Sequence, residues 1–409
     1  MRLSFRQSYE LNSKAITNAQ EKLNDASARL EKQTKILTPA DDPSGIARVV
    51  VLEQQIAAAN QYKTNSDNLR NSLDIEESVL SSIQESVTKA KTLVISLGSG
   101  GNSQIDRVAI ADQLKNIRDE IFDLMNQKDS TGGYLFSGFA ESTQPFVANQ
   151  TTGYYDFKGD EGQKYLQISP SVTVAANDSG KRIFQNVGAR NTTINLAVGG
   201  NITQGKVQVS SQTVFDQFYQ QNYDSVTPAN NDYRVSYAVP DQYQITLQNG
   251  TPLAPPVSGT AVPGQAISFN GLTIEHNGTF PGTLDFTLKP PAKSNILNTL
   301  TDLYQAVVRD QLVPMDLREK LVDATVQLDK AALNVADAIS AIGGRQNLIS
   351  SIAESNEDLK IANTKYRADI YEIDLIEGMT ELSKQETLLK IVQSSFTKVT
   401  GMSLFDYMR

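Results

Sequence analysis

The single imidazole of the chain is the first place to look for catalysis. His276 stands in the run Glu275-His276-Asn277-Gly278, whose composition is that of a strand end or a surface turn. A Ser-His-Asp triad would have to use this histidine, and a two-histidine HExxH zinc site cannot be built. Cysteine is absent, which removes thiolate catalysis and cysteine-ligated metals. We therefore predict no catalytic residue, no cofactor and no metal site, and hence a protein that is not an enzyme.

The acidic pair Asp41-Asp42 is the next cluster that could do chemistry, because two adjacent carboxylates can ligate a cation. Asp42, however, is followed by Pro43. An aspartate caps the first turn of a helix well, and proline fits the first helical position, where its missing N–H costs nothing. We therefore favour helix capping over a cation site.

The overall charge narrows the possible partners. The formal net charge of −9 disfavours nucleic acid and anionic membrane surfaces. Residues 1–31 carry charges throughout and lack the apolar segment of a secretory signal, and no apolar run is long enough to cross a bilayer. We expect a soluble protein that binds neither nucleic acid nor membrane. If it is exported, the route must be one without a cleaved signal peptide.

What remains is a seven-residue apolar repeat at both ends of the chain. Such a repeat keeps one face of a helix turned toward a partner helix and is typical of coiled coils. The residues that we predict to form a self-assembly interface are Ile16, Ala19, Leu23, Ala26, Leu30, Leu375, Met379, Leu382, Leu389 and Phe396. Two helices alone bury little surface, so we expect copies of the chain to complete them. The termini would then be loose in the monomer and fold on assembly.

Helical and strand-like segments separate along the chain. Apolar periodicity predicts helices over 8–37, 44–97, 106–128 and 296–307, and a long one from the series Leu321–Ile349 onward with few interruptions. Between residues 141 and 294 lie 11 of the 14 prolines and short runs of alternating polarity, the pattern of antiparallel strands. Inside this region we expect the Pro-rich stretch Thr251–Pro263 to be a loop.

The predicted fold class is α+β. It is an elongated α-helical coiled-coil bundle from N- and C-terminal segments with a β-rich domain inserted in the middle. We expect residues 1–43 and 356–409 to form a terminal coiled-coil assembly domain. Residues 44–140 and 295–355 would form a central helical bundle, and 141–294 the inserted β-rich outer domain.

Several stretches resemble the bacterial flagellins. Ile339–Asn347 is similar to their C-terminal signature, and Leu37–Ala47 to its N-terminal counterpart. Gly133–Gly138 followed by Gln144–Phe146, together with the closing Ser403–Met408, resembles one branch: the hook-associated proteins of the hook–filament junction, the FlgL type. The resemblance covers roughly residues 1–140 and 295–409 and is weak over the β insertion.

The resemblance implies a flagellin-like fold and a role in assembly. Proteins of this branch are exported unfolded by the flagellar type III apparatus to an extracellular place in the bacterial flagellum. Before export, a chaperone binds the C-terminal helix. They form a homo-oligomeric ring on the preceding hook-associated protein, and flagellin polymerises on top. The terminal helices would line an inner tube, the central helices would form a second shell, and the β domain would face outward.

Within this resemblance, Gly343 and Gly344 call for a physical reason. Each glycine inside a helical run costs about 1 kcal/mol in helix propensity. A close crossing with a neighbouring helix would offset that cost, and a kink or break in the helix is the alternative. The residues that we assign to the predicted helix crossing are Asp41, Asp42, Gly343, Gly344, Arg345 and Asn347, with Gln346 beside them.

Two other functions stay open. A flagellin that forms the filament itself would share the terminal signatures, and the sizeable outer domain favours it. The β insertion could instead bind glycans or a surface as an adhesin, or carry hydrolase activity. The clustered tyrosines that motivate the glycan version are Tyr219, Tyr223, Tyr233, Tyr237 and Tyr243. Aromatic residues on strands are, however, more often core residues.

Overall fold

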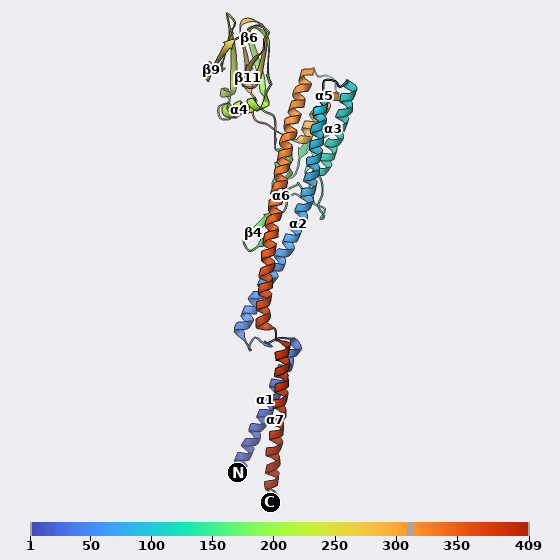
Figure 1. The fold of residues 1–409 in the computed structure, drawn as a ribbon, viewed down its shortest axis with the longest axis vertical. Helices are drawn as coiled ribbons and strands as arrows, with labels where there is room; N and C mark the ends of the chain where they lie inside the picture. Colours follow the sequence, from blue (N-terminus) through green and yellow to red (C-terminus); the bar gives the residue numbers. More distant parts are fainter. Residues whose placement is uncertain (1, 309–313, 408–409) are drawn as a thin grey trace. The chain divides into compact units, whose positions relative to one another are not determined.

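The computed structural model describes residues 2–308 and 314–407 (Figure 1). The chain divides into two compact units, each of which is described by itself. The first comprises Met1–Leu73, Tyr165–Ala176 and Gly343–Arg409, and the second Asp74–Lys164 and Asn177–Ile342. Two long helices, α2 (Pro43–Leu97) and α6 (Pro314–Tyr371), contribute residues to both units.

The first unit is helical and carries one hairpin. Besides parts of α2 and α6 it holds α1 (Arg2–Lys32), α7 (Leu375–Tyr407), β3 (Tyr165–Ser169) and β4 (Val172–Ala175). Side chains of the long helices bind the backbone of the hairpin. Asn65 Nδ2 donates to the carbonyl of Gln167 at 2.7 Å, and Asn356 Nδ2 to that of Ile168 at 2.7 Å. The hairpin is therefore attached to the helices of this unit.

The helices of the second unit pack around buried aliphatic rows. They are the later part of α2, α3 (Gln104–Met125), α5 (Ile296–Val308) and the earlier part of α6. Most residues of the predicted apolar rows are buried; they include Leu80, Ile83, Val87, Val94, Leu114, Ile121, Leu300, Leu303, Leu328, Val335 and Ile342. Ile110, Ile117, Leu124 and Leu321 of these rows are half-buried. Ser103 caps α3 in a reciprocal capping box with Asp106, which fixes the start of that helix.

A small strand region leads from α3 into the insertion. It contains β1 (Phe146–Ala148), β2 (Tyr155–Phe157), β5 (Val187–Gly188), β12 (Lys293–Ser294) and a π-helical turn at Lys181–Gln185. Phe136, Phe146 and Phe184 are buried here, and the rings of Phe136 and Phe184 meet edge to face at 5.1 Å. The branch-specific stretches Gly133–Gly138 and Gln144–Phe146 thus supply a core at the base of the insertion.

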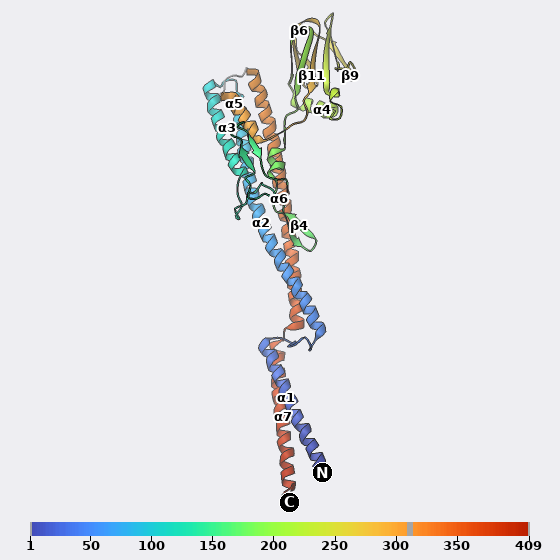
Figure 2. The same cartoon turned by 180° about the vertical axis from the view of Figure 1, so that it is seen from behind.

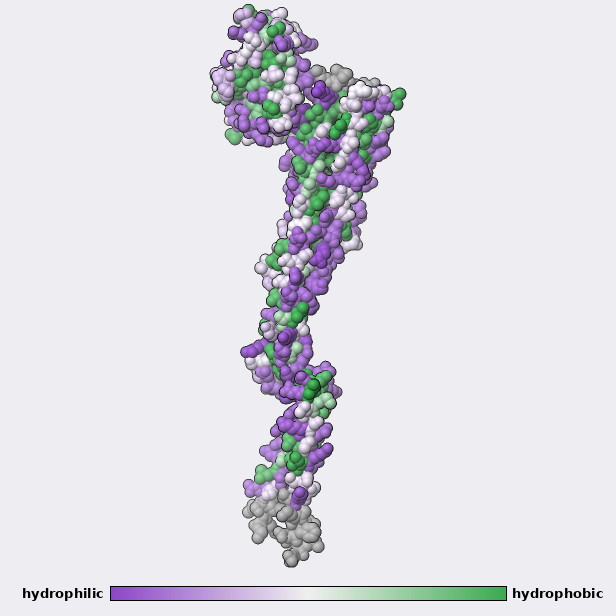
Figure 3. Space-filling model, in the orientation of Figure 1, coloured by the Kyte–Doolittle hydropathy of each residue, from purple (hydrophilic) through white to green (hydrophobic). Residues whose placement is uncertain are grey.

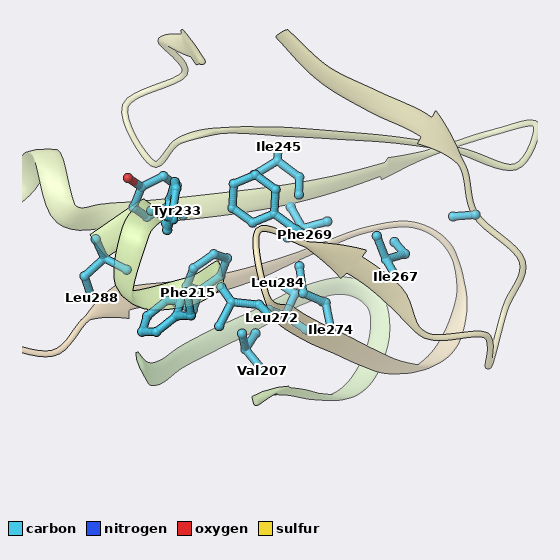
Figure 4. Packing of buried hydrophobic residues seen from close by; sticks show 14 of the residues in the cluster. Val207, Phe215, Tyr233, Ile245, Ile267, Phe269, Leu272, Ile274, Leu284 and Leu288 are labelled. Atoms are coloured by element: carbon cyan, nitrogen blue, oxygen red, sulfur yellow. The ribbon is translucent and has the colours of Figure 1, made fainter. Parts of the chain in front are cut away.

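The rest of the insertion is a six-stranded antiparallel sheet. Its strands are β6 (Thr193–Val209), β7 (Asp232–Ala238), β8 (Gln242–Leu247), β9 (Pro252–Thr260), β10 (Ile267–Phe269) and β11 (Leu272–Leu288). The order is β10-β11-β7-β8-β9, and β6 pairs with β11. Helix α4 (Gln212–Asn222) adds Phe215, Phe218 and Tyr219 to the core. In Figure 4 the ring of Phe215 lies beside Leu272 of β11.

Helices at both ends with an antiparallel β-rich region between them confirm the predicted α+β class. The Pro-rich stretch is a correction. Its residues 252–260 form strand β9 rather than a loop, because β9 lies at the end of the sheet order, where an N–H that proline lacks needs no partner. One interruption, at residues 372–374, separates α6 from α7.

His276 is a second correction. Only 3% of its surface is exposed, and it lies inside β11 against the rings of Tyr237 and Phe280. Its position in the strand alternation, two residues after the buried Ile274, turns it into the core, a placement that the polar neighbours in the sequence concealed. Burial lowers the pKa of the imidazole.

The five clustered tyrosines belong to the same core or pack against it. Tyr219, Tyr233 and Tyr237 are buried, and Tyr223 stacks on Tyr219 with ring centroids 4.9 Å apart. Tyr243 packs against the cluster. These side chains therefore do not form an exposed platform for a sugar ring.

Candidate functional site

The candidate site is the pair of terminal helices, which the chain order keeps apart and the fold brings together. Helices α1 and α7 lie side by side in the first unit, as the two opposite views show (Figures 1 and 2). Near their outer end the rings of Tyr9 and Phe396 meet at 5.3 Å. The predicted pairing of the two helices within one chain is therefore observed.

The contact between the two helices is built from small and half-buried residues. On α1, Ala19 and Ala26 are buried, and Ile16, Leu23 and Leu30 are half-buried. On α7, Leu382, Leu389 and Phe396 are half-buried along the heptad row. At Gly378 an added Cβ would lie 3.1 Å from Leu30 Cδ1, so glycine permits the close approach of the helices there.

Two of the predicted interface residues face away from this contact. Leu375 is 51% exposed and Met379 is 61% exposed. The heptad spacing placed them in the row of Leu382, but the row that meets α1 runs through Gly378 and the buried Gln385 instead. Leu375 and Met379 can therefore contact only something outside the α1–α7 pair.

A hollow of mixed charge lies along the seam of the pair. It measures about 740 Å³ and is lined by Lys22, Asp25, Arg29, Lys35, Glu377, Glu381, Lys384 and Gln385, among others. Gln385 Nε2 donates to Glu381 Oε1, and Lys384 Nζ to Glu381 Oε2. These hydrogen bonds hold the pKa of Glu381 below its usual value. The arrangement is a solvated polar seam between helices rather than a catalytic cluster.

The segment that follows α1 is hydrogen-bonded to the segment that precedes α7. Gln33 has a φ of 53°, and Thr34 forms a β-bridge with Glu372. The N–H of Lys35 donates to the carbonyl of Tyr371 at 2.7 Å, and Thr34 Oγ1 to the same carbonyl at 3.0 Å. Sequence reasoning missed this bridge because single residues in two loops carry no periodic signal.

Asp41 and Asp42 are structural. Asp41 Oδ2 accepts the backbone N–H of Leu37 at 2.9 Å and of Thr38 at 3.0 Å, and these bonds, that from Thr38 first, lower the pKa of Asp41. Asp42 Oδ1 accepts the N–H of Gly45 at 2.8 Å, which confirms the predicted cap of α2. A Cβ on Gly45 would lie 2.2 Å from Asp42 Oδ2. Both carboxylates are thus occupied by backbone donors.

Gly343 and Gly344 lie inside α6, which is helical throughout this stretch. The alternative of a helix break at these glycines is therefore wrong. A Cβ added at either position would meet nothing within 4 Å. Arg345 is half-buried and Asn347 is exposed. In the described part of this chain, no helix crosses at the glycines closely enough to require them.

Two further observations limit the chemistry. Among residues 2–308 and 314–407, no helix is long and apolar enough to cross a membrane, and no group of three or more acidic or histidine side chains is arranged to hold a metal. Of the closing stretch Ser403–Met408, Met408 lies outside the described residues.

Both the sequence and the fold of this chain are similar to those of flagellar proteins. The family described as the bacterial flagellin N-terminal helical region matches residues 4–141. Flagellar hook-associated protein 3 of Salmonella typhimurium is 31% identical over 187 residues, which are 46% of this chain and 58% of that protein. The chain thus spans a little more than half the length of this relative. A flagellin of Clostridium tyrobutyricum is 21% identical over 404 residues, covering 93% of this chain and 94% of its own.

The fold is similar to that of a flagellar protein whose crystal structure is known. The crystal structure of flagellar hook-associated protein-3 from Legionella pneumophila is similar to this chain with a TM-score of 0.59 and 21% identity. The likeness covers 79% of this chain and 99% of that one. The chain is thus similar in sequence to the flagellin N-terminal helical region and to part of a hook-associated protein 3, and it shares the fold of the Legionella protein.

Proposed function

We propose that the chain is a structural subunit of the bacterial flagellum that joins the hook to the flagellin filament by self-assembly of its terminal helices. One observation carries this proposal: large apolar side chains remain on the outer faces of the α1–α7 pair. Leu11 is 64% exposed, Ile376 78%, Met379 61% and Ile391 55%. On the face seen in Figure 3, hydrophobic residues lie among hydrophilic ones along this pair.

A pair of two helices is too small to cover apolar side chains on all of its faces. Most of the stability of a helix in a protein comes from packing its apolar face, and two helices in contact cover one stripe each. Here the covered stripe consists partly of alanines, while larger apolar residues point outward. A tube of several such pairs would cover the outward residues with those of neighbouring copies, as in multi-stranded coiled coils.

In this proposal residues 1–43 and 356–409 form the assembly domain, 44–140 and 295–355 the central helical domain, and 141–294 the outer domain. The partners are further copies in a ring, the preceding hook-associated protein on one side and flagellin on the other. A chaperone binds the C-terminal helix before type III export to the cell exterior. The subunit has a structural role and catalyses no reaction.

The glycines of α6 fit the same proposal. Gly343 and Gly344 leave the helix surface open on the outside, since nothing in the described chain occupies the space of a Cβ. A helix of a neighbouring subunit could approach closely there, which would offset the propensity cost of about 1 kcal/mol per glycine. Arg345 and Asn347 would provide polar contacts beside this crossing.

The test is complementation of a strain from which the gene is deleted. The wild-type gene should restore attached filaments, whereas the double variant Ile376→Asp, Met379→Asp should leave intact hooks without filaments and flagellin in the medium, as seen by electron microscopy. A matched control is Val226→Asp, because Val226 is 89% exposed and belongs to the second unit, whereas α7 belongs to the first. Filaments held firmly by the double variant would contradict the proposal.

A second function, a filament-forming flagellin, has one observation in its favour. The match to the Clostridium flagellin extends over 93% of this chain, far more than the match to the hook-associated relative. A flagellin and a junction subunit differ in whether the purified protein polymerises. A flagellin should polymerise into long filaments on addition of seeds, and a junction subunit should not. Long filaments of the pure protein would decide for the flagellin.

A further inference from the structure

The contact between α1 and α7 does not by itself fix the register, that is, how far one helix is shifted along the other. A shift of α1 by seven residues moves Ile16 onto Leu23, Leu23 onto Leu30 and Ala19 onto Ala26, so large and small side chains alternate as before. Helices whose contact rows repeat every seven residues can therefore meet in more than one register. One such shift corresponds to about 10 Å along the helix axis.

Among residues 6–32 of α1 and 375–395 of α7, no side-chain hydrogen bond or ion pair removes this ambiguity. Each one that these residues form lies within a single helix or its cap. Arg29 attracts Glu381 across the pair, but this lowers the pKa of Glu381 less than the hydrogen bonds within α7 do, that from Gln385 first. A buried polar pair is a usual means of fixing register in coiled coils. Here the register must be set from outside the contact.

The end of α1 gives Thr34 a fixed place relative to that helix. The N–H of Gln33 donates to the carbonyl of Leu30 at 3.2 Å, and the N–H of Thr34 donates to the carbonyl of Arg29 at 3.0 Å. Together with the φ of 53° at Gln33, these two bonds form a Schellman motif, which ends a helix in one defined geometry. The direction in which the chain leaves α1 is therefore determined locally.

The connecting bridge, formed by residues 33–36 and 371–374, then fastens α1 to the segment that precedes α7. The hydroxyl of Thr34 lies 3.0 Å from the carbonyl oxygen of Tyr371, the last residue of α6. The N–H of Lys35 donates to the same carbonyl at 2.7 Å. Because Thr34 is only 2% exposed, water cannot readily replace these bonds when they are broken.

The other side of the connecting bridge places the first turn of α7. The N–H of Ile373 donates to the carbonyl of Gln33 at 3.3 Å. Asp374 Oδ1 accepts the N–H two residues on at 2.7 Å, as an N-cap residue does. A Cβ added at Gly378 would lie 3.1 Å from Ile373 Cδ1 and 3.1 Å from Leu30 Cδ1. The bridge thus sets Gly378 opposite Leu30.

We infer that Thr34 is the positioning residue that selects the register of the terminal helices. Through the connecting bridge it holds the end of α1 and the start of α7 at one level, and the repeating contact row follows in the single register that this start allows. Without the bridge, registers shifted by seven residues become accessible. The inference goes beyond the proposed function, because it concerns the pairing of two helices inside one chain and not the contact between copies.

Disulfide trapping measures the register directly, because the natural chain has no cysteine. The two helices run antiparallel, with both chain termini at the same end of the pair (Figures 1 and 2). Counting outward from the contact of Leu30 with Gly378 by the same number of residues on each helix brings Ala19 opposite Leu389. Mild oxidation captures the register each time the helices meet, so the helices need not be permanently paired.

Three full-length variants would carry Ala19→Cys together with Leu382→Cys, Leu389→Cys or Phe396→Cys. The first and third report registers shifted by seven residues in either direction. In dilute purified protein, the intramolecular disulfide between positions 19 and 389 should exceed the other two about tenfold, because a shifted register breaks at least two buried hydrogen bonds. Peptide mass spectrometry after digestion measures the three yields.

The connecting bridge is removed by Thr34→Val together with Lys35→Pro. Valine keeps the shape of threonine without its hydroxyl, and proline has no N–H to donate to Tyr371. In this background the three disulfide yields should become equal within about twofold. Thr34→Ser keeps the hydroxyl and should preserve the preference. The matched control is Thr17→Val, because the hydroxyl of Thr17 bonds only to Ser13 of its own helix, at 3.2 Å.

Equal yields in the chain with an intact bridge would overturn the inference, and so would a preference that persists without the bridge or that Thr34→Ser abolishes. If the double variant fails to fold, Thr34→Val alone decides, since an undiminished preference in that variant contradicts the role of the hydroxyl. These measurements require no flagellum and no assembly. They therefore remain decisive even where the complementation experiment shows that the proposed function is wrong.

Discussion

The six-stranded sheet and the α1–α7 pair differ in which side chains they bury: the sheet buries its large apolar residues, and the pair leaves many of them exposed. The sheet completes its core within one chain: Phe215, Ile245, Leu272 and Phe286 have no exposed surface. The helical pair buries mainly Ala19, Ala26, Gly378 and Gln385, and leaves larger apolar residues outside.

This difference indicates which of the two regions needs a partner. A region whose core is complete needs no partner for stability. A region that buries its alanines and exposes leucine, isoleucine and methionine side chains gains further stability only when a partner surface covers those side chains. Amino-acid substitutions and a change of pH test this contrast through the free energy of unfolding of the monomer.

Phe286→Ala should destabilise the sheet by about 3–5 kcal/mol, the usual cost of removing a fully buried ring. Phe286 is completely buried and stacks on Tyr233 at 5.3 Å. Urea denaturation followed by the near-ultraviolet circular dichroism of the tyrosines measures the loss. Val239→Ala, at a position 69% exposed, should change stability little. Equal losses in both variants would show that the sheet core is not the stable part.

Acidification should weaken the sheet through His276. Burial lowers the pKa of its imidazole in the folded protein below the ordinary 6.5, so the unfolded chain takes up the proton first. Stability is therefore lost as the pH falls below about 6.5, by at most about 1.4 kcal/mol per pH unit, until the lowered pKa is reached.

The variant His276→Phe keeps an aromatic ring against Tyr237 and Phe280 and should remove this slope. Asp285 does not interfere in that range. Hydrogen bonds, chiefly from Arg234, hold its pKa below the ordinary 3.8, so the stability that it contributes is lost only at lower pH. Denaturation midpoints between pH 7 and pH 5 make the comparison. An unchanged slope in the variant would place the titrating group elsewhere.

Gly344→Ala should stabilise the monomer by about 1 kcal/mol, because alanine favours the helix and the space of the added Cβ is empty. If a neighbouring subunit crosses here, the same methyl group should weaken assembly and reduce filament attachment in the complementation strain. Thermal melting of the monomer and electron microscopy give the two readouts. A stabilised monomer that assembles normally would remove the crossing from the proposal.

Met379→Ala should have the smallest effect on the monomer, within about 0.5 kcal/mol, since exposed substitutions change stability little. Met379 is 61% exposed on α7. The same change should weaken assembly if neighbouring copies cover this side chain. A monomer strongly destabilised by Met379→Ala would mean that the α1–α7 pair is already a complete core, and the contrast with the sheet would disappear.

Most of the secondary structure could be predicted from the periodicity of apolar residues in the sequence. The predicted helix over 44–97 is observed as Pro43–Leu97, with the Asp42 cap, and the region predicted to hold antiparallel strands contains them, β7 among others. The end of α1 was predicted five residues too late, because residues 33–42 form a connection held by Thr34 and Asp41 rather than by a periodic pattern.

Burial of individual residues was harder to predict. His276 looked like a surface residue because its neighbours in the sequence are polar, yet the register of β11 against β6 turns its side chain inward. The prolines of residues 252–256 looked like a loop, although an edge strand tolerates them. Both errors arise because a polar or proline-rich run says nothing about the place of a strand in its sheet.

Local spacing and composition were sufficient to predict the order of the elements, the Asp42 cap of α2 and the two terminal heptad rows. The tertiary structure decided which side of each row is covered. It turns Gly378 and Gln385 toward α1 and leaves Met379 outside. Spacing places residues on a common face, whereas only the arrangement of packed elements determines which face meets a neighbour and which remains for a partner.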